Sequence, residues 1–255
     1  MTATGGLRFD DGAPVHARPA QRPTTIDAMT ETVVGNVPDD CTQVIVVYAD
    51  SFESTDGVLF CYERESKDSP WVERAGSDKG DGLLVYLGEG AIGGAGDNSF
   101  ETPIGSFPLG VAFGHEPNFG CDMDYFEAVD GVDFWDSGFE YWFDDYSQNL
   151  PTTYNTHITK DAIRPPKDGV THEVESLGTE PAYDYAVFVD HNPSRRPGWG
   201  CAIFLHCKED DDDDSDTDQL TEGCIAADST LMRWILQWLR KARHPHLSVI
   251  TGLDE

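Results

Sequence analysis

The stretch Gly200-Cys201-Ala202-Ile203-Phe204-Leu205-His206 is an apolar run that ends in a histidine. Pro197-Gly198 precedes it and charged residues follow it, a composition typical of a buried β-strand. Because side chains alternate along a strand, the residues of this one divide between two faces. One face takes Ala202, Phe204 and His206, and the other takes Cys201, Ile203, Leu205 and Cys207. The stretch therefore predicts a strand that presents a histidine at its end.

A cysteine follows this strand after an acidic loop. Residues 209–218 are almost entirely Asp and Glu, which predicts a solvated loop, and the chain returns at Thr221-Glu222-Gly223-Cys224. A thiol and a histidine brought together are the parts of a nucleophile and its general base. Gly223 would let the backbone approach a substrate closely and point N–H groups at a developing oxyanion.

These residues resemble the active-site signature of L,D-transpeptidase catalytic domains of the YkuD type. The resemblance is to the branch with a Gly-x-Ala-Ile-Phe-Leu-His strand and a Thr-x-Gly-Cys motif. Further segments match in the family's order, so that the resemblance covers residues 41–251. They are Thr102-Pro103-Ile104-Gly105-Ser106-Phe107-Pro108-Leu109-Gly110, Trp142-Phe143-Asp144-Asp145, Tyr154-Asn155, and residues 185–192.

The resemblance implies a mainly β fold, an L,D-transpeptidase-like sandwich or barrel with one long amphipathic helix near the C-terminus. It implies a cysteine acyltransferase without metal or cofactor, in which Cys224 attacks a peptide carbonyl and His206 takes the thiol proton. The resulting thioester would pass its acyl group to an amine. The implied donor is a peptidoglycan stem peptide, and the implied process is cell-wall cross-linking.

The resemblance also assigns roles to residues around the nucleophile. Gly223 would contribute to the oxyanion site, and Thr221 would order the loop that carries the cysteine. The remaining matches would shape the substrate cleft, and they are Thr102, Pro103, Tyr154 and Asn155. The aspartates of residues 142–145 are expected to serve structure, because adjacent side chains point apart.

The cysteine motif departs from that of the better-known branch of the family. Glu222 replaces a histidine, and Ala226 stands where an arginine follows the cysteine. That arginine is expected to hold a carboxylate, so the donor of this chain is left open. Negative charge on the acidic loop, and on Glu222 if it faces the site, would raise the pKa of Cys224.

Two other classes of function compete with acyl transfer. A zinc site could draw on Cys201, His206, Cys207 and Cys224, but alternation turns two of these cysteines away from the histidine and no Cys-x-x-Cys pair exists. A non-catalytic or hydrolytic relative of the same fold could instead bind a peptide or cell-wall ligand. Thiol alkylation that depends on His206 would separate the enzyme from the binder.

Acidic residues dominate the charge of the chain, with 47 Asp and Glu against 17 Lys and Arg and a formal net charge of −30. Nucleic acids and anionic membranes would be repelled, which makes them poor partners. Such a surface is typical of proteins adapted to high salt, and equally of an acidic soluble protein with charged loops. The sequence leaves both interpretations open.

The sequence gives little on location or assembly. No segment has the roughly 18 apolar residues of a membrane helix, and residues 1–40 lack the apolar core of a secretory signal. Export is therefore not supported, although the family typically acts in the cell envelope. The six cysteines are too sparse and irregular for a disulfide scaffold and are expected to be mostly buried thiols. The oligomeric state is left open.

The rest of the pattern predicts a flexible extension over residues 1–40 and one catalytic domain over residues 41–252. Alternating apolar runs predict six further strands. They lie at residues 42–48, 57–65, 71–74, 82–87, 183–190 and 246–251. Residues 88–97 are glycine-rich, but no Walker-type lysine follows, which argues against a phosphate loop. Residues 113–150 are interpreted as a loop-rich region whose many aromatic residues pack to anchor loops, or less readily form a groove.

One helix is predicted near the C-terminus. Asp228 is a suitable N-cap, and apolar residues then recur at helical spacing: Leu231, Trp234, Ile235, Trp238 and Leu239. Arg240 and Lys241 are expected in the last turn, where they would suit the helix dipole. Pro245 prevents the helix from continuing. This helix is expected to serve packing.

Overall fold

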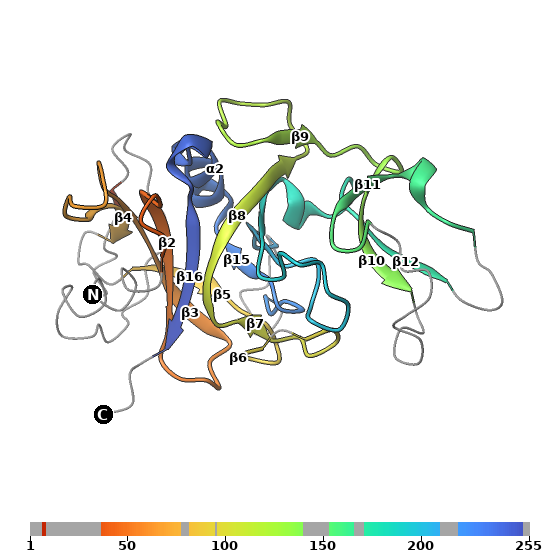
Figure 1. The fold of residues 1–255 in the computed structure, drawn as a ribbon, viewed down its shortest axis with the longest axis horizontal. Coiled ribbons are helices and arrows are strands. Elements are labelled where there is room, and N and C mark those ends of the chain that lie inside the picture. Colours follow the sequence, from red (N-terminus) through yellow and green to blue (C-terminus); the bar gives the residue numbers. More distant parts are fainter. Residues whose placement is uncertain are drawn as a thin grey trace, which may run out of the picture.

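The computed structural model describes residues 7–8, 37–77, 82–94, 96–139, 153–165, 171–209 and 219–251. The fold is mainly β, as predicted, and combines a closed barrel with one α-helix in this part of the chain (Figure 1). Most of the predicted extension, the 142–145 segment and the acidic residues 210–218 lie outside the described residues. Residues 7–8 form β1 (Leu7–Arg8), which pairs with β4 (Val72–Ser77).

The barrel is a ring of hydrogen-bonded strands that begins and ends at β3 (Asp56–Glu63). The ring passes through β2 (Gln43–Ala49), β16 (His246–Thr251), β8 (Gly105–Gly114), β13 (Tyr185–Val189), β14 (Phe204–Cys207), β15 (Ile225–Ala227) and β5 (Leu83–Tyr86). β5 pairs back onto β3, which closes the ring. Two neighbouring pairs are parallel, β2 with β16 and β14 with β15, and the other pairs are antiparallel.

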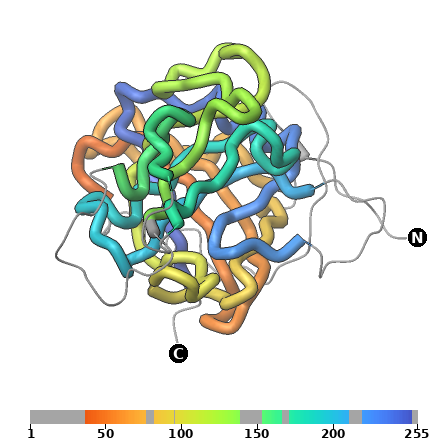
Figure 2. Tube along the Cα trace, turned by 90° about the vertical axis from the view of Figure 1, so that its right-hand side faces the viewer, coloured from red at the N-terminus to blue at the C-terminus, as the bar shows by residue number. Residues whose placement is uncertain are grey.

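A second, three-stranded sheet lies beside the barrel (Figure 1). Its order is β11 (His157–Thr159), β10 (Asp133–Phe139) and β12 (His172–Ser176). Figure 2 looks onto the side of the molecule that carries this sheet. The smaller elements are β6 (Ile92–Gly93), β7 (Thr102–Pro103), β9 (Tyr125–Glu127) and the 3-10 turns η2 (Lys160–Ala162), η3 (Pro181–Tyr183) and η4 (Lys241–Arg243). β10, β11 and β12 were not predicted from the sequence.

The six additional strands expected from alternation are all present, as β2, β3, β4, β5, β13 and β16, with ends shifted by a few residues. β2 and β3 form the expected antiparallel pair, with Tyr48 opposite Val58. The strand expected over residues 200–206 is much shorter, because β14 begins only at Phe204. The segment expected to be loop-rich contains β9 and all of β10, so that expectation was wrong in part.

The α-helix α2 (Ser229–Trp238) begins where predicted, with the Asp228 carboxylate accepting hydrogen bonds from the N–H groups of Thr230 (2.9 Å) and Leu231 (3.4 Å). It ends earlier than expected, because Leu239 is already extended. Arg240 and Lys241 therefore lie beyond the helix, and the expected dipole interaction in its last turn is not formed.

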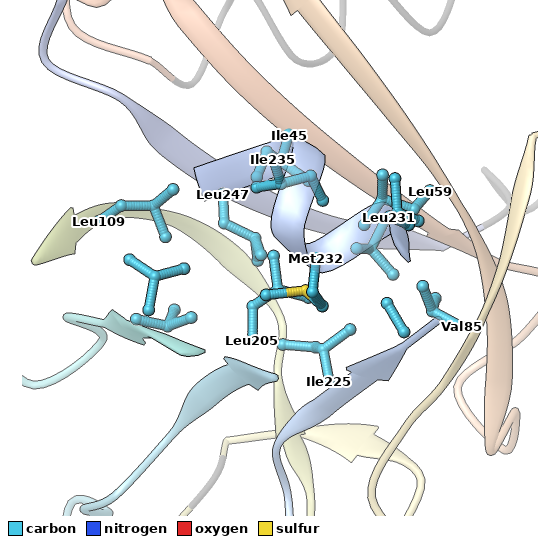
Figure 3. Close-up of a cluster of buried hydrophobic side chains, with 14 of the residues drawn as sticks. Ile45, Leu59, Val85, Leu109, Leu205, Ile225, Leu231, Met232, Ile235 and Leu247 are labelled. Carbon is cyan, nitrogen blue, oxygen red and sulfur yellow. The ribbon is translucent and has the colours of Figure 1, made fainter. Parts of the chain in front are cut away.

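Side chains from the strands surround the buried face of α2 and fill the barrel (Figure 3). The helix contributes Leu231, Met232, Ile235 and Leu236 to this core. A second cluster lies on the opposite face of β8, β13 and β14. It is mainly aromatic and comprises Phe113, Ala128, Trp135, Leu177, Ala182, Tyr183, Ala186, Phe188, Phe204 and Cys224. The barrel is thus packed on its outside as well, against the three-stranded sheet.

Candidate active site

A cavity of about 720 Å³ opens beside this aromatic cluster, and it contains both residues of the predicted catalytic pair. Cys224 and His206 line it from the barrel. Ser137 of β10 and Glu175 of β12 line it from the three-stranded sheet. The site is therefore formed between the outer face of the barrel and the small sheet.

The parallel pairing of β14 with β15 places the thiol and the imidazole on one face. His206 lies opposite Ala226 and Leu205 lies opposite Ile225, so Cys224 falls next to Phe204. Phe204 and His206 share a face because they are two residues apart on one strand. Cys224 packs in the same cluster as Phe204. The two site residues are thus diagonal neighbours, and the parallel pairing is possible because a dozen or more residues connect the two strands.

The backbone bends sharply just before β14. Ala202 has a φ of 53°, in the left-handed region that a non-glycine residue rarely adopts. Its N–H donates to the Asn155 side-chain oxygen at 3.1 Å, and its carbonyl accepts from the Cys224 thiol at 3.3 Å. The bend ends the strand alternation, so Cys201 lines the cavity and does not turn away from it as predicted.

The Cys224 thiol is held by two backbone groups. It donates to the Ala202 carbonyl and accepts from the Phe204 N–H at 3.3 Å. Burial raises the pKa of Cys224 well above its ordinary value, and the negative charges of Glu175 and Glu222 raise it further. Glu222 was expected to raise the pKa of Cys224 only if it faced the site, and it lines the cavity. The resting thiol is therefore neutral.

His206 is a neutral imidazole with one nitrogen available. Its Nδ1 lies 2.7 Å from the Cys207 carbonyl, an acceptor, so Nδ1 carries the proton. Burial lowers the pKa of His206 to about 4, which keeps the ring uncharged at neutral pH. Within the described part of the chain, no hydrogen bond joins His206 to Cys224. The unprotonated Nε2 is free to act as a base.

The cysteine loop supplies one free backbone donor for an oxyanion. The Cys224 N–H has no hydrogen-bond partner among the described residues, whereas the Gly223 N–H donates to Thr221 Oγ1 at 3.3 Å. Thr221 in turn donates its hydroxyl to the Cys224 carbonyl at 2.7 Å. Thr221 thus fixes the loop, and Gly223 does not offer the N–H that was expected of it.

Glycine at position 223 is required by the backbone. Its φ is +112°, and a Cβ atom there would lie 2.8 Å from the Glu101 carbonyl oxygen. Gly88 packs against it, since a Cβ on Gly88 would lie 3.0 Å from the Gly223 Cα. Gly88, the first residue of the glycine-rich segment, therefore packs directly against the backbone of the cysteine loop.

The four predicted cleft residues are not among the described residues that line the cavity; they hold its walls. Thr102 accepts from the Gly88 N–H at 2.8 Å and donates to the Cys224 carbonyl at 3.3 Å, and Pro103 follows it in β7. Tyr154 donates its hydroxyl to Asp97 at 2.9 Å, and Asn155 holds the bend at Ala202.

The sequence interpretation missed several residues of the site. Tyr183 lines the cavity and donates its hydroxyl to Glu175, and its ring meets that of His206 edge-on, with centroids 5.6 Å apart. Asp97 fixes the opposite wall by accepting from the N–H groups of Gly198 (2.7 Å) and Gly200 (2.9 Å). Glu175 has a weak signal in the sequence, because it lies on a strand without apolar alternation.

Glu175→Gln is expected to stabilise the protein at alkaline pH. Burial, together with the charges of Glu222 and Glu180, raises the pKa of Glu175 to about 7, although the Tyr183 hydroxyl lowers it. A carboxyl whose folded-state pKa is raised contributes stability at low pH that is lost as the pH rises through about 7. Glutamine has no such loss. The variant should gain about 2 kcal/mol over the parent between pH 5 and pH 8, measured by urea unfolding; an equal difference at both pH values would contradict this.

Other chemistries find less support in the described residues. No group of three or more His, Cys, Asp or Glu residues there could hold a metal ion. All six cysteines are free thiols; five are buried and Cys201 is partly exposed. In the same residues, no helix is long and apolar enough to cross a membrane. Comparisons with models of protein families, with curated proteins and with solved structures find no match for this chain.

Proposed function

We propose that the protein is a cysteine acyltransferase of the L,D-transpeptidase type, with Cys224 as nucleophile and His206 as base. The supporting observation is that a thiol, an unprotonated imidazole nitrogen and a free backbone N–H meet in one cavity. These are the three groups that acyl transfer through a thioester needs. By the resemblance of the motifs, the donor is a stem peptide of peptidoglycan and the acceptor is an amine.

Acylation begins with a neutral pair. The Cys224 Sγ attacks the donor carbonyl carbon while its proton passes to His206 Nε2, and the oxyanion accepts a hydrogen bond from the Cys224 N–H. The C–N bond then breaks, and the proton on His206 goes to the leaving amine. This leaves a thioester on Cys224.

Deacylation reverses these roles. An acceptor amine attacks the thioester carbonyl and gives its proton to His206, which returns that proton to the departing Cys224 sulfur. The product is a new amide. Water in place of the amine gives a carboxylic acid, and that outcome defines the hydrolytic alternative.

A carbapenem is the direct test of the acylating thiol. Its strained lactam is an activated amide that Cys224 should open and retain. After incubation of the protein with the carbapenem in high salt, intact mass spectrometry should show one adduct of the full carbapenem mass. Cys224→Ala should show none. Cys201→Ser is the matched control, because Cys201 is the other thiol in the cavity and should not be required.

A folded parent protein without an adduct would contradict the proposal. It would favour the alternative of a relative that binds a peptide or cell-wall ligand without turnover. One observation supports that alternative, because the resting thiol is neutral and is bonded to the Ala202 carbonyl, not to His206.

A further inference from the structure

The cavity carries a strongly one-sided charge. Its acidic lining residues are Asp97, Glu101, Glu173, Glu175, Glu209 and Glu222. Asp97 and Glu101 accept hydrogen bonds from backbone N–H groups of the walls, but Glu175 and Glu222 lie beside the nucleophile, where both raise the pKa of Cys224. Lys208 is the one Lys or Arg among the described lining residues. An anionic ligand would therefore be repelled from the thiol.

Two unpartnered atoms in the same cavity are both hydrogen-bond acceptors. His206 is 8% exposed, and its Nε2 carries a lone pair without a partner in the described part of the chain. Gln219 also lines the cavity, and its buried side-chain oxygen has no partner among the same residues. Acceptors that line a cavity without a partner suit a ligand with N–H or O–H donors. An ammonium group has three such donors and a positive charge.

We infer that the acyl donor of this site carries an ammonium group, bound beside Cys224 by Glu175 and Glu222, and that donors with a carboxylate at that position are rejected. The inference rests on the proposed function, since it names the class of acyl donor. Phe100 and Leu220, exposed apolar residues of the cavity lining, suit the aliphatic part of such a ligand.

Binding of this kind would also activate the nucleophile. Glu175 and Glu222 oppose thiolate formation, and a bound cation would cancel their field at the sulfur. The described lining offers few positive charges, so the substrate would supply the one that the thiolate needs. Neutral and anionic donors of equal intrinsic reactivity would react more slowly at Cys224.

Alkylating reagents that differ in charge test this inference without requiring acyl transfer. The probes are 2-bromoethylammonium, iodoacetamide and iodoacetate, applied at pH 8 in the lowest salt in which the protein stays folded. Peptide mapping by mass spectrometry gives the rate at Cys224, and each rate is divided by that of N-acetylcysteine. The normalised rate should be at least about tenfold higher for the cationic than for the anionic reagent.

The variants Glu175→Gln and Glu222→Gln, alone and combined, should move this ratio toward one. Glu127→Gln is the matched control, because Glu127 is an exposed acid of β9 outside the described cavity lining and its loss changes the net charge equally. It should leave the ratio unchanged. A parent ratio near one, or a ratio that the double variant retains, would overturn the inference.

The carbapenem experiment separates this inference from the proposed function. A parent that forms the adduct but has no charge preference keeps the acyltransferase function and loses the ammonium site. A parent with the charge preference but no adduct supports the cation site and overturns acyl transfer.

Discussion

His206→Asn is expected to slow acylation of Cys224 by a carbapenem by about 10²–10⁴-fold, the usual contribution of a general base. The asparagine amide can replace Nδ1–H as a donor to the Cys207 carbonyl, so the local structure should persist while the base is lost. The pKa of His206 is about 4, so its basic form is present throughout the neutral range.

The pH dependence distinguishes this role from a structural one. The parent rate should be flat between about pH 5 and pH 6, because His206 is unprotonated, Cys224 is neutral and Glu175, with a pKa of about 7, is still mainly protonated in that range. The variant can react only through its small thiolate fraction, so its rate should rise about tenfold per pH unit. Stopped-flow or mass-resolved kinetics measure both.

His191→Asn is the control for this experiment. The Nδ1 of His191 also lies near a backbone carbonyl, that of Val189 at 3.4 Å, and burial likewise lowers its pKa, but it is not among the residues lining the cavity. Its replacement should leave the profile flat. A flat profile in His206→Asn at the parent rate would show that His206 is not the base.

Asp136→Ala should destabilise the protein by about 3 kcal/mol, because each buried donor left without an acceptor costs about 1–3 kcal/mol. Asp136 is fully buried, and its carboxylate accepts from the Thr153 hydroxyl at 2.7 Å and the Gly138 N–H at 2.9 Å. The Nε2 of His172 lies 2.9 Å from the same carboxylate. Alanine leaves all these donors without an acceptor, and urea unfolding measures the loss.

Asp161→Ala is the matched control, because Asp161 is an exposed acid of η2, and it should change stability by less than about 0.5 kcal/mol. Asp136→Asn should fall between the two, since the amide keeps one oxygen. A stability of Asp136→Ala close to that of Asp161→Ala would show that the three-stranded sheet does not depend on the buried carboxylate.

Much of the barrel could be predicted because its strands bury one apolar face against the core. β2, β3 and β16 show this pattern plainly, and their positions follow from the sequence within a few residues. The N-cap at Asp228 was predictable for a similar reason, since capping depends on a few adjacent residues.

The three-stranded sheet could not be found in this way, because polar side chains fill part of its interior. Asp133 lies 2.7 Å from His157, and Asp136 lies 2.9 Å from His172, so buried charge replaces apolar alternation. The bend at Ala202 was hidden for another reason. It depends on the side chain of Asn155, which is distant in the sequence, within a run that is apolar like a strand.

Some residues of the candidate site could likewise be predicted from local sequence, and others depended on tertiary packing. Cys224 and His206 were found because their motifs are local and their strands are apolar. Glu175 and Tyr183 were missed because their position beside them depends on how the small sheet packs against the barrel. The acidic environment of the thiol was expected from the acidic loop, and from Glu222 if it faced the site, but the contribution of Glu175 required the tertiary structure.

The position of β16 has a consequence for the order of folding during synthesis. This strand comes last along the described chain, yet it lies in the wall of the barrel between β2 and β8. Until residues 246–251 leave the ribosome, both neighbours present unpaired backbone edges and the ring stays open. Closure must therefore follow translation of this strand, and the nascent chain passes through a stage in which open strand edges favour association with other chains.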